Sequence, residues 1–134
     1  MAKIRKVVIF TDGAAEPNPG PAAIGVVIRD EQGKTVTRIS QAIGRASNNQ
    51  AEYRALIAAL EKANSLGACD VEIRSDSELL VRQINGQYRV KAIALKPLHQ
   101  KVTELLRLLE KFTITHIPRE ENTEADKLAG MALK

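Results

Sequence analysis

The order of hydrophobic patterns along the chain limits the possible folds more than any other feature. Apolar and β-branched runs typical of strands occupy residues 5–12, 22–29 and 36–43, with turn residues between them. Helical spacing of apolar residues begins only after Ser47, and helical and strand patterns then alternate to the end of the chain. The predicted order is β-β-β-α-β-α-α-β-α, which indicates an α/β fold.

The connections between these segments predict how the strands pair. Short loops join the first three strands, so they should form an antiparallel meander. Strand, crossover helix and strand give parallel neighbours with a right-handed connection. The strands predicted at 71–75 and 112–117 should therefore run parallel to the first strand. We predict a five-stranded mixed sheet with helices on both faces. The unbroken apolar run of the first strand suggests that both of its sides are covered.

Local signals mark the ends of the helices. Ser47 and Gln50 form a capping-box pattern at the start of the first helix, and Gly67 marks its end. The second helix is predicted to end at Gly86 and the third to begin near Pro97. The last helix should follow Asn122 or Thr123.

Composition narrows the class of protein. A length of 134 residues fits one catalytic domain, expected to span 1–134, and 44% hydrophobic residues suffice for a core. No apolar run is long enough to cross a membrane or to form a signal-peptide core, so no membrane contact is expected. The lone Cys69 suits a reducing compartment, and we expect a cytoplasmic protein. A net charge of +4 is compatible with a polyanionic partner.

Four carboxylates are placed by this topology at one edge of the sheet. Asp12 and Asp76 end parallel strands, and the helices that carry Glu52 and Asp126 begin at the same edge. Any one of these acids is more typical of a helix cap or a solvated charge, but four independent caps need not converge. Carboxylates that lie close together need a compensating cation, and Mg²⁺ prefers carboxylate oxygen and water. The arrangement predicts a two-metal site for phosphoryl displacement.

The segments around these acids resemble the type 1 ribonuclease H family in its compact form. The matching segments, in chain order, are FTDGAAEPNPGPAAIGVVI, GRASNNQAEYRALIAAL, VEIRSDSELLVRQI and ITHIPREENTEADKLA. The resemblance implies a ribonuclease H-like fold and an endonuclease that hydrolyses the RNA strand of RNA/DNA hybrids, leaving 5′-phosphate and 3′-hydroxyl ends. It also implies two Mg²⁺ ions per site, with Mn²⁺ as a possible substitute. We expect a monomer with no protein partner.

The resemblance also implies a role for each acid. Asp12 resembles the acid that bridges both metals, and Glu52 and Asp76 resemble ligands of the metal beside the leaving group. Asp126 resembles the ligand of the metal that activates water.

Five further residues resemble the family's nucleic-acid contacts. Asn18, Asn48 and Asn49 resemble its minor-groove contacts, and amides suit base edges and 2′-hydroxyls because they both donate and accept. Arg45 and Ser47 resemble a pocket for a DNA phosphate. The simpler alternatives are a turn residue at Asn18 and a plain helix cap at Ser47.

The chain departs from the family pattern in two places. Many relatives carry a histidine in a loop before the last helix, whereas residues 117–121 contain none. His116 lies inside the preceding strand pattern and is expected to be structural. Many relatives also have a basic, tryptophan-bearing insertion, but only residues 87–96 fill that gap here. These differences put substrate affinity in question more than the chemistry.

Three alternatives remain at this point. A non-catalytic nucleic-acid-binding domain with this fold would be expected to lack one of the four acids. The same nuclease can also be a domain cut from a reverse transcriptase polyprotein. A phosphatase-like enzyme with Asp12 as nucleophile would need a second acid two residues on, where the chain has Ala14.

Overall fold

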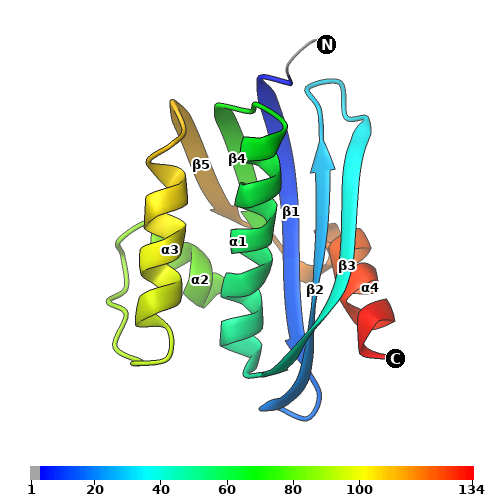
Figure 1. Cartoon of the computed structure of the whole chain (residues 1–134), viewed down its shortest axis with the longest axis vertical. Coiled ribbons are helices and arrows are strands. Elements are labelled where there is room, and N and C mark those ends of the chain that lie inside the picture. The colour runs from blue at the N-terminus through cyan, green and yellow to red at the C-terminus, as the bar shows by residue number, and fades with distance from the viewer. Residues whose placement is uncertain (1–3) are drawn as a thin grey trace.

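The computed structural model describes residues 4–134 as one mixed sheet with helices on both faces (Figure 1). The strands are β1 (Lys6–Ala15), β2 (Gly20–Arg29), β3 (Thr35–Ala46), β4 (Asp70–Ser75) and β5 (Lys111–His116). The helices are α1 (Asn48–Ser65), α2 (Glu78–Ile84), α3 (Lys96–Leu106) and α4 (Thr123–Leu133), and a 3-10 turn, η1 (Arg119–Glu121), precedes α4. Within 4–134, no helix has the length and hydropathy needed to cross a membrane. The expected domain also includes residues 1–3, which lie outside the described range.

The strand order confirms the predicted topology. The sheet runs β3-β2-β1-β4-β5. β1 pairs with β2, and β2 with β3, in antiparallel fashion, whereas β1 pairs with β4, and β4 with β5, in parallel. The carboxyl ends of β1, β4 and β5 therefore meet at one edge of the sheet.

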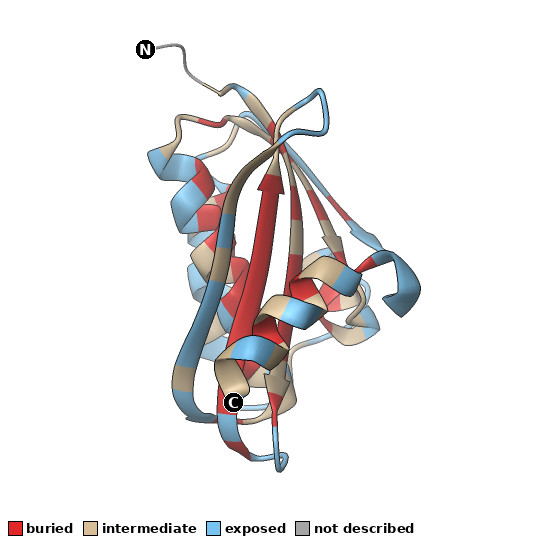
Figure 2. Ribbon diagram, turned by 90° about the vertical axis from the view of Figure 1, so that its right-hand side faces the viewer, coloured by how far each residue is buried: buried red, intermediate tan, exposed pale blue. Residues whose placement is uncertain are grey.

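The helices divide into two layers. α1 and α2 pack against one face and α3 packs against α1, and the apolar side chains of these helices join those of β1, β2 and β4 in the main core. α4 crosses the other face and contacts β1, β2 and β3 (Figures 1 and 2). Because α4 has only 11 residues, part of this second face stays open to solvent.

The open part of the second face corrects one expectation about β1. Val7 and Ile9 are fully buried under α1, but Val8 and Phe10 on the opposite side are only half-buried. The prediction that both sides of this strand are covered is therefore wrong for its first half. The Phe10 ring is flanked instead by the Arg29 guanidinium, 5.0 Å from its centroid.

The local helix signals correspond to the observed ends. Ser47 Oγ accepts a 3.1 Å hydrogen bond from the Gln50 N–H, and Gln50 Oε1 accepts one of 2.8 Å from the Ser47 N–H, so the capping box is present. Gly67 follows α1 with a φ of 85°, a left-handed conformation that glycine adopts without strain. β1 extends three residues beyond its predicted end at Asp12, to Ala15.

Candidate active site

An acidic hollow lies at the edge of the sheet where β1 and β4 end. Asp12 comes from β1, Glu52 from near the start of α1, Asp76 directly follows β4, and Asp126 lies in the first turn of α4. The hollow has a volume of about 360 Å³, and all four carboxylates line it. The remaining lining residues are Gly13, Ala14, Ala15, Glu16, Asn48 and Arg119. The topology argument thus placed the four acids together, as the structure does.

Three of the four carboxylates form a tight group. Asp12, Glu52 and Asp76 each present one oxygen, and these oxygens all lie within 4.8 Å of one another. Asp126 lies at the more open side of the hollow, with 48% of its side chain exposed. Its Oδ1 is 3.9 Å from Nη2 of Arg119, which is itself 80% exposed. The site therefore has a compact, sheltered part and a looser part.

Gly13 fixes the carboxylate of Glu52. Its backbone N–H donates a 3.0 Å hydrogen bond to Oε1 of Glu52. A Cβ at Gly13 would lie 2.3 Å from the carbonyl carbon of Ala51 and 2.5 Å from the nitrogen of Glu52. The backbones of β1 and α1 are thus in direct contact, and only glycine leaves room for that contact.

Burial, together with neighbouring carboxylates, raises the pKa values of Asp12, Glu52 and Asp76. Burial, followed by the charge of Asp76, raises the pKa of Asp12 from its ordinary 3.8 to about 8. Burial and then the charge of Asp12 raise the pKa of Glu52 well above its usual range. Burial also raises the pKa of Asp76, although a hydrogen bond with Asn122 and the charge of Arg119 act to lower it. A bound cation would relieve this charge repulsion, so the site suits a divalent ion.

Asn122 is a site residue for which the sequence indicated only a helix start. It occupies the N-cap position of α4, but its side chain makes no capping hydrogen bond. Its Nδ2 donates a 2.8 Å hydrogen bond to the carbonyl of Thr11, and the residue is 1% exposed. This bond ties the segment before α4 to β1, next to Asp12.

The amide residues expected to contact nucleic acid join the β1–β2 loop to α1. Asn18 Oδ1 accepts a 3.0 Å hydrogen bond from the Asn48 N–H, and Asn48 Oδ1 accepts one of 2.7 Å from the Ala15 N–H. Asn49 is exposed. Asn48 also lines the acidic hollow, whereas Asn18 and Asn49 do not. The structure therefore brings Asn48 beside the carboxylates and ties Asn18 to it, and it shows no such contact for Asn49.

The two residues expected at a phosphate pocket lie outside the acidic hollow. Ser47 serves as the N-cap of α1, as the simpler alternative suggested, and its hydroxyl hydrogen remains available to donate. Arg45 is exposed on β3, beside a shallow hollow that it lines with Ala132 and Leu133.

The segment without the family histidine brings an arginine to the hollow instead. η1 begins at Arg119, which lines the hollow beside Asp126. His116 is exposed at the end of β5, so the expectation that it packs as a structural residue is wrong. The reason is that β5 is an edge strand, and within it only Ile114 is buried.

Comparison with known proteins adds independent findings. The family described as "Reverse transcriptase-like" matches residues 10–132. A ribonuclease HI of Halobacterium salinarum is 44% identical over 96% of this chain and 64% of its own length. A bifunctional protein of Mycobacterium tuberculosis is 43% identical over 96% of this chain and 35% of its own length. The chain thus spans less than two thirds of each of these two relatives.

Solved structures agree with the sequence comparison. The crystal structure of the Halobacterium salinarum ribonuclease H1 has a TM-score of 0.93, covering 96% of this chain and 97% of that one. LC11-RNase H1, solved in complex with an RNA/DNA hybrid, is 45% identical with a TM-score of 0.90, covering 95% of this chain and 96% of that one. These matches extend across the fold that carries the acidic hollow, and the chain belongs to the type 1 ribonuclease H family.

Proposed function

We propose that this chain is an endoribonuclease that hydrolyses the RNA strand of RNA/DNA hybrids. The observation that carries the proposal is the convergence of four carboxylates in one hollow, three of them with raised pKa values. A relative 45% identical that is solved with an RNA/DNA hybrid supports the choice of substrate.

The donor set fits Mg²⁺, with Mn²⁺ as a substitute. Three hard carboxylate oxygens within 4.8 Å of one another match the ligands that these ions prefer. Two such ions, when bound, would stabilise the charge that develops on the attacking and leaving oxygens of an in-line displacement. In this proposal Asp12 would hold both ions, Glu52 and Asp76 the one beside the leaving group, and Asp126 the one beside the attacking water. The products would carry 5′-phosphate and 3′-hydroxyl ends.

The chain's own groups keep this site ordered. Asp12 is only 6% exposed, so the sheet fixes its position. The N–H of Gly13 holds one oxygen of Glu52, which leaves the other oxygen free for a cation. This preformed arrangement reduces the reorganisation needed when a substrate binds.

We assign the discrimination between the RNA and DNA strands of the hybrid to the polar residues near the hollow. Asn18 and Asn48 use their oxygens in the bonds that join the β1–β2 loop to α1, so their NH₂ groups can donate to base edges or 2′-hydroxyls. We assign Asn49 to the same minor-groove surface. Arg45 and the Ser47 hydroxyl would contact a phosphate of the DNA strand.

The test is a cleavage assay on end-labelled RNA/DNA, RNA/RNA and DNA/DNA duplexes with Mg²⁺ or Mn²⁺. We expect cleavage of the RNA strand of the hybrid alone. The new 5′ ends should carry a phosphate group that phosphatase treatment removes. Asp12→Asn should abolish cleavage, whereas Glu31→Gln, in an exposed turn, should leave it intact. Cleavage of DNA, or equal cleavage of double-stranded RNA, would contradict the proposal. Hybrid binding without cleavage in either metal would favour the non-catalytic alternative.

We further propose that the protein acts as a monomer in the cytoplasm. This chain supplies all four carboxylates of the acidic hollow, so one copy carries the full set of acids that the proposal requires. The unpaired thiol of Cys69 is half-exposed and suits a reducing compartment. Sedimentation of the active protein, together with fractionation of the source cells, would check both statements.

A further inference from the structure

We infer that Glu124 is a positioning residue: by bridging Arg29 and Arg38, it sets the orientation of the first turn of α4 and thereby the place of the Asp126 carboxylate. The inference rests on the proposed function, because it concerns the acid assigned to the ion beside the attacking water. Glu124 itself does not line the acidic hollow.

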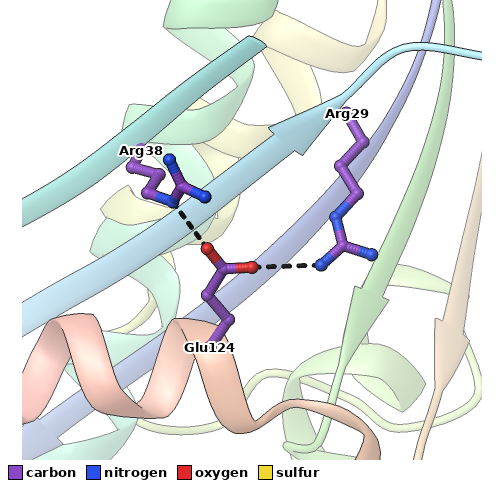
Figure 3. A network of polar contacts seen from close by, with 3 residues as sticks. All are labelled: Arg29, Arg38 and Glu124. Carbon is purple, nitrogen blue, oxygen red and sulfur yellow. Dashed lines mark hydrogen bonds and ion pairs between the residues drawn. The ribbon is translucent and has the colours of Figure 1, made fainter. Parts of the chain in front are cut away.

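The contacts of Glu124 reach two different strands (Figure 3). Its Oε1 accepts a 3.0 Å hydrogen bond from Nη2 of Arg29, at the end of β2. Its Oε2 accepts one of 2.6 Å from Nε of Arg38, on β3. Because each oxygen is held from a separate strand, the bridge restricts both sliding and rotation of the helix turn. Charge-assisted bonds of this kind are about twice as strong as neutral ones.

One half of the bridge is held in place independently of Glu124. The guanidinium of Arg29 lies 5.0 Å from the centroid of the Phe10 ring, and 37% of the Arg29 side chain is exposed. Arg38 is 57% exposed and has no such aromatic neighbour among the described residues. Arg29 is therefore the more fixed anchor, and Arg38 the more adaptable one.

Helix geometry connects Glu124 to Asp126. Residues two positions apart on an α-helix point about 200° from each other around its axis. Glu124 thus faces the arginines on the sheet, while Asp126 faces the hollow on the other side of α4. Rotation of this turn would release one carboxylate and displace the other.

The carboxylate of Asp126 has weaker local support than the other site acids. Glu52 accepts a 3.0 Å hydrogen bond from a backbone N–H, and the pKa-lowering hydrogen bond of Asn122 reaches Asp76. Asp126 instead pairs at 3.9 Å with the exposed Arg119. Its side chain also lies within hydrogen-bonding reach of Asp12, and the first turn of α4 determines how closely the two carboxylates approach.

The other attachments of α4 lie before its first turn or further along the helix than Glu124. A Cβ at Gly25 would lie 2.0 Å from the carbonyl oxygen of Ala125, so the helix backbone rests directly on β2. Ser40 Oγ donates a 2.6 Å hydrogen bond to the Leu128 carbonyl, one turn further along. The bond from Asn122 fixes the chain just before the helix begins. The bridge at Glu124 adds two side-chain hydrogen bonds from the first turn of α4 to the sheet.

The experiment compares Glu124→Gln in two backgrounds, the parent and Asp126→Asn. Calorimetric titration with Mn²⁺ measures metal affinity without substrate, and the Mg²⁺ concentration at half-maximal cleavage rate gives a second reading. In the parent background, Glu124→Gln should weaken Mn²⁺ binding about 10-fold, as loss of a supporting contact behind a metal ligand typically does. It should lower kcat and leave KM for the hybrid unchanged. In the Asp126→Asn background it should have no further effect on metal affinity.

Two further variants separate positioning from stability. Ser40→Ala removes a contact of α4 with β3 away from the first turn, and should lower Tm without changing metal affinity. Arg38→Met removes half of the bridge and should act as Glu124→Gln does, to a smaller extent. The inference is overturned if Glu124→Gln behaves like Ser40→Ala, or if it weakens metal binding equally in both backgrounds. If the parent itself neither binds Mn²⁺ nor cleaves hybrids, the proposed function fails, and this inference fails with it.

Discussion

Gly13 and Glu52 are joined by a 3.0 Å hydrogen bond from the backbone N–H of the first to Oε1 of the second. The residue that follows Asp12 along β1 thus holds the acid contributed by α1. The strand carries one acid of the site and orients another, so packing of α1 on β1 and the geometry of the site cannot change independently.

A methyl group at position 13 should therefore disturb both the fold and the site. We expect Gly13→Ala to lower the free energy of unfolding by about 3 kcal/mol, because the new Cβ would meet backbone atoms that cannot move aside. Gly130→Ala is the matched control, since a Cβ there meets nothing within 4 Å. That helical change should stabilise the protein by up to about 1 kcal/mol. Urea unfolding of both variants measures the two effects, and equal stabilities would contradict the close contact at Gly13.

Replacing Asp12 by a neutral amide should stabilise the metal-free protein. Asp12→Asn keeps the side-chain shape and removes a carboxyl group that is ionised in the unfolded chain at pH 7 but whose charged form is disfavoured on folding, by burial and by Asp76. We expect a higher Tm in chelator, by roughly 3–5 °C for a gain of about 1 kcal/mol. Mg²⁺ should raise the Tm of the parent by mass action and that of the variant much less. A variant that melts lower in chelator and responds equally to Mg²⁺ would show that the acids are not a repelling metal cluster.

The stability of the metal-free protein should fall as pH rises. The pKa of Asp12 rises on folding from 3.8 to about 8, so between these values the folded state binds more protons than the unfolded chain. Below the unfolded pKa this group carries no penalty. The penalty grows as pH rises and is complete above the folded pKa. Urea unfolding in chelator across this range should show the decline, and Asp12→Asn should flatten it. An equally steep decline in the variant would assign the pH dependence to other groups.

Arg119 is a positive charge placed in a hollow that should bind cations. Arg119→Ala should therefore increase the affinity of the free protein for Mg²⁺, because a like charge beside the site is removed. The same change should lower Tm in chelator, since the carboxylates lose a counter-charge. Calorimetry and melting curves check both effects, and Arg107→Ala, exposed at the end of α3, is the control. Weaker Mg²⁺ binding in Arg119→Ala would instead indicate that the arginine supports the metal ligands.

Arg45 should contribute to substrate binding without affecting the chemical step. It is exposed and lies outside the acidic hollow, so Arg45→Ala should raise KM for the hybrid about 10-fold and leave kcat unchanged. The slope of log affinity against log salt should decrease by about one, because one phosphate contact is lost. Lys34→Ala, in the β2–β3 turn, should change neither quantity. A fall in kcat at constant KM would assign Arg45 a different role.

Much of the fold could be predicted because its signals are local. Apolar periodicity reports which side of a strand or helix is buried, and the capping pair Ser47 and Gln50 marks the start of α1. The shared edge of the four acids followed from strand direction alone. The contacts that orient them could not be predicted, since Glu124 meets Arg29 and Arg38 across 95 and 86 residues of sequence.

The failed expectations also have physical reasons. His116 shares a strand face with buried Ile114, as a core residue would, but it lies at the very end of the edge strand β5, where it is exposed. Phe10 and Val8 are apolar, yet both are only half-buried, because the first turn of α4 borders a small hollow at Phe10 and does not close over it. Sequence periodicity indicates a preferred side and does not show how far the covering helix extends.

The contact between Gly25 and Ala125 makes the width of the active site adjustable in one direction only. The two backbones already touch, so no substitution in the core can bring α4 nearer to the sheet. Any larger side chain at position 25, or any overpacked neighbour, can only wedge the helix outward and widen the gap between Asp126 and Asp12. Random changes around this helix should therefore produce sites that are too open for their ions, and rarely sites that are too narrow.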